Sequence, residues 1–203
     1  MEITRETYNK IGADWHKDHQ KDDWWVDGTD AFIKMLAPNG RVLDAGCGSG
    51  VKTRYLTKHG VRVLGIDFSE TLIGIARAEV DAEFGVMDMR AAPQMSETFD
   101  GVFAQASLLH IPRADMPGVV AGLASRLNPK GHFYVAVKGV RDGSPLEETK
   151  EESDYGYSYR RFFSYFRPEE VESYLVQAGL AVVYRDVRVT GNTEWIQVIG
   201  QKP

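Results

Sequence analysis

The chain has 203 residues, of which 43% are hydrophobic and 26% charged, a composition that predicts one globular domain with a peripheral addition. The net charge of −5 argues against a global basic surface for nucleic acid, and no apolar run approaches the roughly 18–20 residues that span a bilayer. The single cysteine excludes an intrachain disulfide framework, and the opening residues lack the basic-then-apolar order of a signal peptide. We therefore expect a cytoplasmic protein, monomeric or homodimeric, with no nucleic-acid or membrane partner.

Residues 1–40 are predicted to form a helical cap of two amphipathic helices. The first apolar face carries Tyr8, Ile11 and Trp15 at helical spacing. The second face consists of Trp25, Thr29, Phe32 and Leu36. The second helix is expected to end at Pro38-Asn39-Gly40, and both helices to pack beside the sheet that follows.

Strand-like and helix-like segments alternate over residues 41–139. The candidate strands are Arg41–Asp44, Val61–Asp67, Ala82–Met87, Phe99–Gln105 and His132–Lys138. Such alternation predicts a parallel sheet with helices on both faces. The helix before the last of these strands is expected to follow Ile111-Pro112. Its apolar stripe comprises Met116, Val120, Leu123 and Leu127.

Residues 140–166 are predicted to be a loop at the same edge of the sheet as the glycine-rich segment described below. Residues 167–203 begin with a helix that Pro168 opens and Gly179 caps. Two extended runs follow, Leu180–Val189 and Glu194–Gly200, and their close spacing requires an antiparallel hairpin. Together the segments form a single predicted domain over residues 1–203.

The segment Val42–Gly50 places a short apolar strand and Asp44 before three glycines on alternate positions. Such glycines allow a sharp turn and leave room for a ligand against the main chain. A dinucleotide-binding loop would need a glycine at the position of Val51. A phosphate-binding P-loop would need Gly-Lys-Ser/Thr at its end, but here Gly50 is followed by Val51-Lys52-Thr53. The remaining pattern, Asp-x-Gly-x-Gly-x-Gly, resembles the first motif of class I methyltransferases that use S-adenosylmethionine (SAM).

The resemblance covers roughly residues 40–200, since an acidic residue also ends the second strand (Asp67) and follows the third (Asp88). It implies a seven-stranded Rossmann-like sheet, mostly parallel, with SAM as the cofactor and S-adenosylhomocysteine as its product. Asp67 is then expected to accept hydrogen bonds from the ribose, and Asp88 with Met89 to meet the adenine. Asp44 would bind the α-ammonium group or cap the amides of its own loop. The implied cofactor-binding residues are Asp44, Gly46, Cys47, Gly48, Gly50, Asp67, Phe68, Asp88, Met89 and Gln105.

Phe68 could pack on the adenine ring or belong to the ordinary core, and Cys47 is interpreted as a small packing residue of the loop. His110 follows the fourth strand and is the best candidate for a general base, although it could simply hydrogen-bond the loop backbone. The candidate acceptor-binding residues are Tyr8, Trp15, Tyr157, Tyr159 and Arg160, with ordinary packing as the alternative. Trp24 and Trp25 are further candidates for covering the cofactor. No metal site is predicted, because His16 and His19 have no evident third ligand.

The sequence thus predicts an enzyme that transfers a methyl group from SAM to a small-molecule acceptor by in-line displacement. Two alternatives stay open: a SAM-binding regulatory or scaffolding subunit without activity, and a methyltransferase acting on protein or RNA. The acidic charge argues against RNA, although a local basic patch beside the cleft would reopen that alternative.

Overall fold

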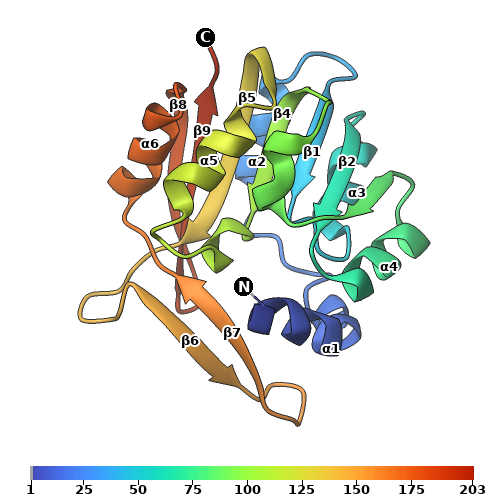
Figure 1. Ribbon diagram of the computed structural model, residues 1–203, viewed down its shortest axis with the longest axis vertical. Coiled ribbons are helices and arrows are strands. Elements are labelled where there is room, and N and C mark those ends of the chain that lie inside the picture. Colours follow the sequence, from blue (N-terminus) through green and yellow to red (C-terminus); the bar gives the residue numbers. More distant parts are fainter. Residues whose placement is uncertain (1) are drawn as a thin grey trace.

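Five parallel strands and a C-terminal antiparallel pair form the central sheet of the computed structural model, which describes residues 2–203 (Figure 1). The strand order is β3-β2-β1-β4-β5-β9-β8, with β9 antiparallel to β5 and β8 antiparallel to β9. The strands are β1 (Arg41–Ala45), β2 (Arg62–Asp67), β3 (Glu83–Val86), β4 (Phe99–Gln105), β5 (Leu127–Lys138), β8 (Ala181–Thr190) and β9 (Thr193–Gln201). The predicted α/β fold with its closing hairpin is confirmed.

Helices cover both faces of this sheet. They are α1 (Glu2–Asp18), α2 (Val26–Met35), α3 (Val51–Lys58), α4 (Glu70–Glu79), α5 (Met116–Ala124) and α6 (Pro168–Gln177), with 3-10 turns η1 (Met89–Gln94) and η2 (Leu108–His110). Phe32 of α2 and Leu56 of α3 pack against one face, beside Phe103 and Tyr134. Helices α5 and α6 bury their apolar sides on the other face. None of the helices within residues 2–203 combines the length and apolar character that crossing a bilayer requires.

Helix α5 ends earlier than its apolar stripe predicted, and Leu127 belongs to β5 instead. Leu127 pairs with Phe99, after which the register shifts so that His132 pairs with Gly101. Pro129 favours extended backbone at Asn128, because a proline disfavours helical backbone in the residue before it. The chain leaves the helix after Ala124 and enters the strand three residues later.

Residues 140–166 are predicted to be a loop, but they instead contain a separate two-stranded antiparallel sheet. It consists of β6 (Glu147–Glu152) and β7 (Tyr159–Ser164), and it projects from the end of the main sheet where the parallel strands terminate (Figure 1). The acidic run Glu147–Glu152 forms β6, and its last residue, Glu152, accepts two hydrogen bonds from the Arg161 side chain.

Helix α1 lies between α4 and the β6–β7 hairpin rather than beside α2 (Figure 1). Thr7 Oγ1 donates to the carbonyl of Arg160 at 2.6 Å, and the Phe162 amide donates to Thr4 Oγ1 at 3.1 Å. On the other side, Ser69 Oγ donates to Asn9 Oδ1 at 2.7 Å. The first helix of the cap therefore covers the carboxyl edge of the sheet, whereas the second packs on a face.

Candidate functional site

The glycine loop after β1 adopts backbone angles that side-chain-bearing residues rarely take. Gly46, Gly48 and Gly50 have φ values of 82°, 55° and 80°. A Cβ atom on Gly46 would lie 2.3 Å from Cβ of Ser107, so the loop also approaches the end of β4 too closely for any side chain. The Gly46 and Cys47 amides donate to the carbonyl of Ile66, at 2.8 and 3.0 Å. These contacts fix the loop at the carboxyl edge of the sheet.

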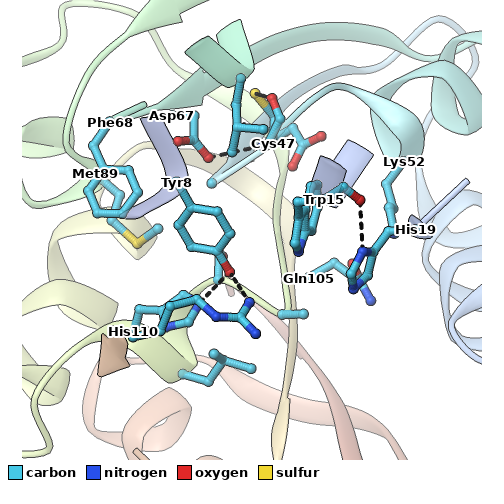
Figure 2. Close-up of a pocket in the computed structure, with 18 of the residues that line it drawn as sticks. Tyr8, Trp15, His19, Cys47, Lys52, Asp67, Phe68, Met89, Gln105 and His110 are labelled. Carbon is cyan, nitrogen blue, oxygen red and sulfur yellow. Dashed lines mark hydrogen bonds between the residues drawn. The ribbon is translucent and has the colours of Figure 1, made fainter. Parts of the chain in front are cut away.

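A cavity opens at this edge, between the loop and helix α1 (Figure 2). The predicted cofactor residues that line it are Asp44, Gly46, Cys47, Gly48, Asp67, Phe68, Asp88, Met89 and Gln105. Gly50 does not line the cavity. It stands immediately before α3 in the left-handed conformation and approaches Val80 and Ala76. Its role in the loop is thus to turn the chain into the helix.

Asp44 is buried at the end of β1 and accepts a hydrogen bond from Thr53 Oγ1 at 2.6 Å. Burial, reinforced by the nearby charge of Asp67, raises the pKa of Asp44 to about 7, although the Thr53 hydrogen bond and the charge of Lys52 act in the opposite direction. No cation pairs with this carboxylate among residues 2–203. Such a carboxylate is suited to a ligand that brings its own positive charge.

Asp67 accepts hydrogen bonds from two main-chain amides beside the cavity. Its Oδ2 accepts from the Gly48 amide at 2.9 Å, and its Oδ1 accepts from the Ser69 amide at 2.8 Å. Burial raises the pKa of Asp67 to about 6, although these backbone hydrogen bonds favour the ionised form. Each carboxylate oxygen keeps a further lone pair for a ligand hydroxyl.

Asp88 is more exposed than Asp44 and Asp67 and has a cationic partner. Arg90 donates from Nη2 to Asp88 Oδ2 at 2.6 Å and from Nε to both carboxylate oxygens at 3.0 Å. Burial alone would raise the pKa of Asp88, but the hydrogen bonds and charge of Arg90 outweigh it and hold this pKa below its ordinary value. Asp88 therefore stays ionised at the adenine-side end of the predicted site.

His110 is buried, and both of its ring nitrogens have partners. Nδ1 lies 2.7 Å from the carbonyl of Phe162, which can only accept, so Nδ1 carries the proton. Nε2 therefore accepts from the Tyr8 hydroxyl at 3.0 Å, and Arg161 Nη1 donates to the same hydroxyl at 3.0 Å (Figure 2). Burial lowers the pKa of His110 to about 3. The imidazole is thus a neutral acceptor that orients Tyr8.

Of the predicted acceptor residues, Tyr8 and Trp15 line the cavity, with ring centroids 5.8 Å apart. Tyr157, Tyr159 and Arg160 do not line it. The Tyr157 hydroxyl donates to Asp14 at 2.9 Å, and that of Tyr159 donates to Asp154 at 2.8 Å. These two tyrosines pack beyond the cavity, under α1.

Arg160 and its neighbour Arg161 point to opposite sides of β7, as successive residues of a strand do. Arg160 is exposed, whereas Arg161 and Phe163 line the cavity. The sequence reasoning therefore placed the arginine of this segment one residue too early. The side of β7 that faces the cavity is set by its pairing with β6, which the sequence analysis did not predict.

Further lining residues were missed. They include His19, Asp22, Lys52, Lys138, Arg161, Phe163 and Trp195. Trp24 lines the cavity as well and stacks on Trp195 with ring centroids 3.7 Å apart, whereas Trp25 packs against Tyr55. Lys138 could have been found, because it ends the predicted fifth strand at the carboxyl edge where open α/β sheets bind ligands.

Comparison with known proteins agrees with this geometry. Residues 42–131 match a family model described as a methyltransferase domain. The chain is 30% identical over 187 residues to a ubiquinone biosynthesis O-methyltransferase of Rhizobium rhizogenes, covering 88% of this chain and 73% of the relative. Its match to the Sinorhizobium medicae protein of the same name, also 30% identical, spans 61% of that relative's length.

Solved structures show the same fold at lower identity. A Burkholderia thailandensis 1,6-didemethyltoxoflavin-N1-methyltransferase with bound S-adenosylhomocysteine aligns with a TM-score of 0.76 at 18% identity, over 99% of this chain and 88% of that one. A Synechocystis magnesium protoporphyrin IX methyltransferase aligns with a TM-score of 0.74 at 19% identity, over 100% of this chain and 99% of that one. The chain belongs to the class I SAM-dependent methyltransferases, enzymes whose cofactor is SAM.

Within residues 2–203, no group of three or more histidine, cysteine, aspartate or glutamate side chains is arranged to hold a metal ion. The sole cysteine, Cys47, is buried in the glycine loop, and burial raises the pKa of its thiol well above the ordinary value. A thiol in that state is a poor nucleophile, which agrees with the packing role expected from the sequence.

Proposed function

We propose that this protein transfers the methyl group of SAM to a small-molecule acceptor by in-line displacement. One observation carries the proposal: a single cavity receives the carboxylates of all three cofactor motifs and, across from them, a wall of aromatic and cationic side chains. Helix α1 contributes Tyr8 and Trp15 to this cavity (Figure 2). A donor and an acceptor bound there would be held together and shielded from water, as direct transfer requires.

The acidic part of the cavity fits the cofactor. SAM supplies a methyl group already activated on a positively charged sulfur. Asp44 has no cationic partner within residues 2–203 and would meet the α-ammonium group. Asp67 would accept from the ribose hydroxyls, and Asp88 with Met89 would face the adenine beside Phe68. Gly46, Cys47 and Gly48 leave the main chain open to close approach.

The opposite wall would position the acceptor. Tyr8 presents a hydroxyl that Arg161 and His110 hold from two sides, at 3.0 Å each. We assign His110 to orienting this hydroxyl rather than to taking a proton from the acceptor, because its Nε2 is already occupied by Tyr8 and its pKa is about 3. The Tyr8 hydroxyl would then hydrogen-bond the acceptor group as it is aligned for transfer.

The names of similar proteins support a small acceptor. The curated relatives are ubiquinone biosynthesis O-methyltransferases, and two structural neighbours methylate 1,6-didemethyltoxoflavin and magnesium protoporphyrin IX. All three names describe small organic molecules with ring systems. Aromatic side chains in the cavity of this chain provide matching flat surfaces, namely Tyr8, Trp15, Phe163 and Trp195.

Calorimetric titration with SAM tests the binding half of the proposal. We expect one site per chain, and we expect Asp67→Ala to weaken SAM binding at least tenfold, because the ribose loses its acceptor and the Gly48 amide its partner. Lys58→Met changes an exposed residue of α3 and serves as the control. If the parent protein fails to bind SAM, the proposal is wrong.

Turnover needs its own experiment, because a regulatory SAM-binding subunit would pass the titration. The protein is incubated with SAM and with separate small-metabolite and macromolecular fractions of a cell extract, and the release of S-adenosylhomocysteine is measured. Methyl transfer predicts release that depends on particular fractions. If macromolecular fractions alone support release, the acceptor is a protein or a nucleic acid, contrary to the proposal.

A further inference from the structure

Two side chains at the end of the sheet line the cavity with hydrogen-bond donors that have no acceptor among residues 2–203. Gln105 is only 8% exposed, and its Nε2 has no hydrogen-bond partner among residues 2–203. Lys138 also lines the cavity, and its ammonium group makes no ion pair or hydrogen bond within the same residues. A buried donor without a partner is costly, so a ligand that accepts from both groups would gain their full interaction.

The register of the sheet brings these donors together. Gln105 of β4 is paired with Ala136 of β5, and Lys138 lies two residues further along β5. Side chains of paired residues and of residues two apart share one face of a sheet. Gln105 and Lys138 are therefore diagonal neighbours on the same face, at the carboxyl ends of adjacent strands.

The surroundings of Lys138 increase its need for an anion. The ammonium group lies 4.5 Å from the ring centroid of Phe163 and 5.7 Å from that of Trp195. Burial lowers the pKa of Lys138 to about 8, and the charge of Arg161 acts in the same direction. Glu152 is the nearby anion, but both of its carboxylate oxygens accept from Arg161 at 2.7 Å.

We propose that Lys138 and Gln105 form a subsite for a carboxylate group of the methyl acceptor, which makes the acceptor an organic acid with a flat ring system. A carboxylate offers two oxygens, one for the lysine ammonium group and one for the glutamine amide. The aromatic rings beside Lys138 would contact the rest of the molecule. This inference rests on the proposed function and names its substrate class.

The lysine of this subsite lies away from the expected position of the amino-acid group of SAM. Asp44 of β1 is paired with Phe103 of β4, and Phe103 is in turn paired with Tyr134 of β5. Lys138 thus lies two strands across and four residues beyond Asp44, roughly 16 Å between Cα atoms at about 4.8 Å per strand and 3.3 Å per residue. Gln105, two residues beyond Phe103 on β4, lies closer to Asp44. Lys138 is therefore the group of the subsite that distinguishes a carboxylate of the acceptor from the carboxylate of SAM.

The test uses the full chain saturated with S-adenosylhomocysteine and three probes of one shape: benzoate, benzamide and methyl benzoate. Calorimetry or ligand-observed NMR measures their affinities. We expect benzoate to bind with a millimolar or lower dissociation constant and about tenfold more tightly than either neutral probe. Lys138→Met should remove this preference, while Lys138→Arg retains it and Lys58→Met leaves it unchanged. Equal binding of all three probes, or no binding of benzoate, would overturn the inference.

Two outcomes separate the inference from the proposed function. If Lys138→Met weakens S-adenosylhomocysteine binding tenfold, the subsite belongs to the cofactor and the inference is wrong, although the proposed function stands. If the parent protein binds neither SAM nor S-adenosylhomocysteine, the proposed function fails first.

Gln105→Leu adds a readout independent of any probe. Because the variant removes an unpaired buried donor, we expect its melting temperature without ligand to equal or exceed that of the parent. Its preference for benzoate should nevertheless fall. A clear drop in melting temperature would instead assign Gln105 a structural role.

Discussion

The two sides of the cavity are built in different ways. On the β1–β3 side, each predicted ligand-binding group lies at the end of a strand or in the loop that follows it, as Asp44, Asp67 and Asp88 do. On the β4–β7 side, Tyr8, His110, Lys138 and Arg161 come from four distant segments. The first side is acidic and suits a cationic donor, whereas the second is aromatic and basic. The difference indicates that local motifs define the methyl donor and tertiary packing defines the acceptor.

Two charged groups of the cavity, one on each side, are satisfied to different degrees. Arg161 is partly buried and bound to Glu152 through two hydrogen bonds of 2.7 Å. Asp44 is more deeply buried and has only the Thr53 hydroxyl as a hydrogen-bond partner. The free protein therefore holds an ionisable group that favours the neutral state until a ligand supplies positive charge. Stability without ligand and affinity for SAM should oppose each other at this residue.

Asp44→Asn should have the largest effect and should change the two properties in opposite directions. We expect SAM affinity to fall about a hundredfold, because the α-ammonium group loses its counter-charge. At pH 8 the ligand-free variant should be more stable by on the order of 2–4 kcal/mol, since folding no longer requires a buried carboxylate with a pKa near 7. Calorimetry and thermal denaturation measure the two changes.

The pH dependence of that stability gain is its control. The folded-state pKa of Asp44 is raised above its ordinary value of 3.8, so the parent's stability is greatest below about pH 4 and declines as the pH rises through about 7. The advantage of Asp44→Asn should consequently shrink on acidification and vanish near pH 4. A gain that is constant with pH would mean that the raised pKa is not its source.

SAM affinity of the parent should itself depend on pH. In the free protein the pKa values of Asp44 and Asp67 are about 7 and about 6, and a bound cation lowers both by favouring the ionised form. Affinity should therefore fall by about tenfold or more between pH 8 and pH 5.5, with proton release on binding in that range. Calorimetry in buffers of different ionisation enthalpy counts the protons. Affinity independent of pH would separate these carboxylates from the cofactor.

The contrast between the two sides also explains what the sequence could predict. The seven strands, the glycine loop, Asp67 and Asp88 follow from patterns within a few residues of chain, and the structure places them as expected. The sequence points to Arg160 as an acceptor-binding residue, whereas Arg161 lines the cavity. The side of β7 that faces the cavity depends on its pairing with β6, which short-range patterns do not show. Leu127 is expected in a helix because its spacing continues the apolar stripe of α5, whereas the structure pairs it with Phe99 in β5.

Tyr8→Phe tests whether α1 belongs to the acceptor side. The variant leaves His110 Nε2 and Arg161 Nη1 without the hydroxyl that each contacts at 3.0 Å, so it should cost about 1–2 kcal/mol in unfolding free energy. SAM affinity should change less than about threefold, because the hydroxyl points away from the acidic side. Tyr55→Phe, which removes a half-buried hydroxyl bound to Asp30, is the matched control and should cost less. Loss of SAM binding in Tyr8→Phe would move α1 to the cofactor side.

Asp88→Ala should have the smallest effect of the changes on the acidic side. Asp88 is half-exposed and already shared with Arg90, so a hydrogen bond from the adenine amine would replace water rather than satisfy a buried charge. We expect SAM affinity to fall only about three- to fivefold in Asp88→Ala. The fall should be smaller in Asp88→Asn, because asparagine keeps an acceptor oxygen. Arg90→Met frees the carboxylate and should leave affinity equal or higher. If Asp88→Ala instead matched Asp44→Asn, exposure would not govern the strength of these contacts, and the acidic side would act as one coupled group of carboxylates rather than as three separate sites.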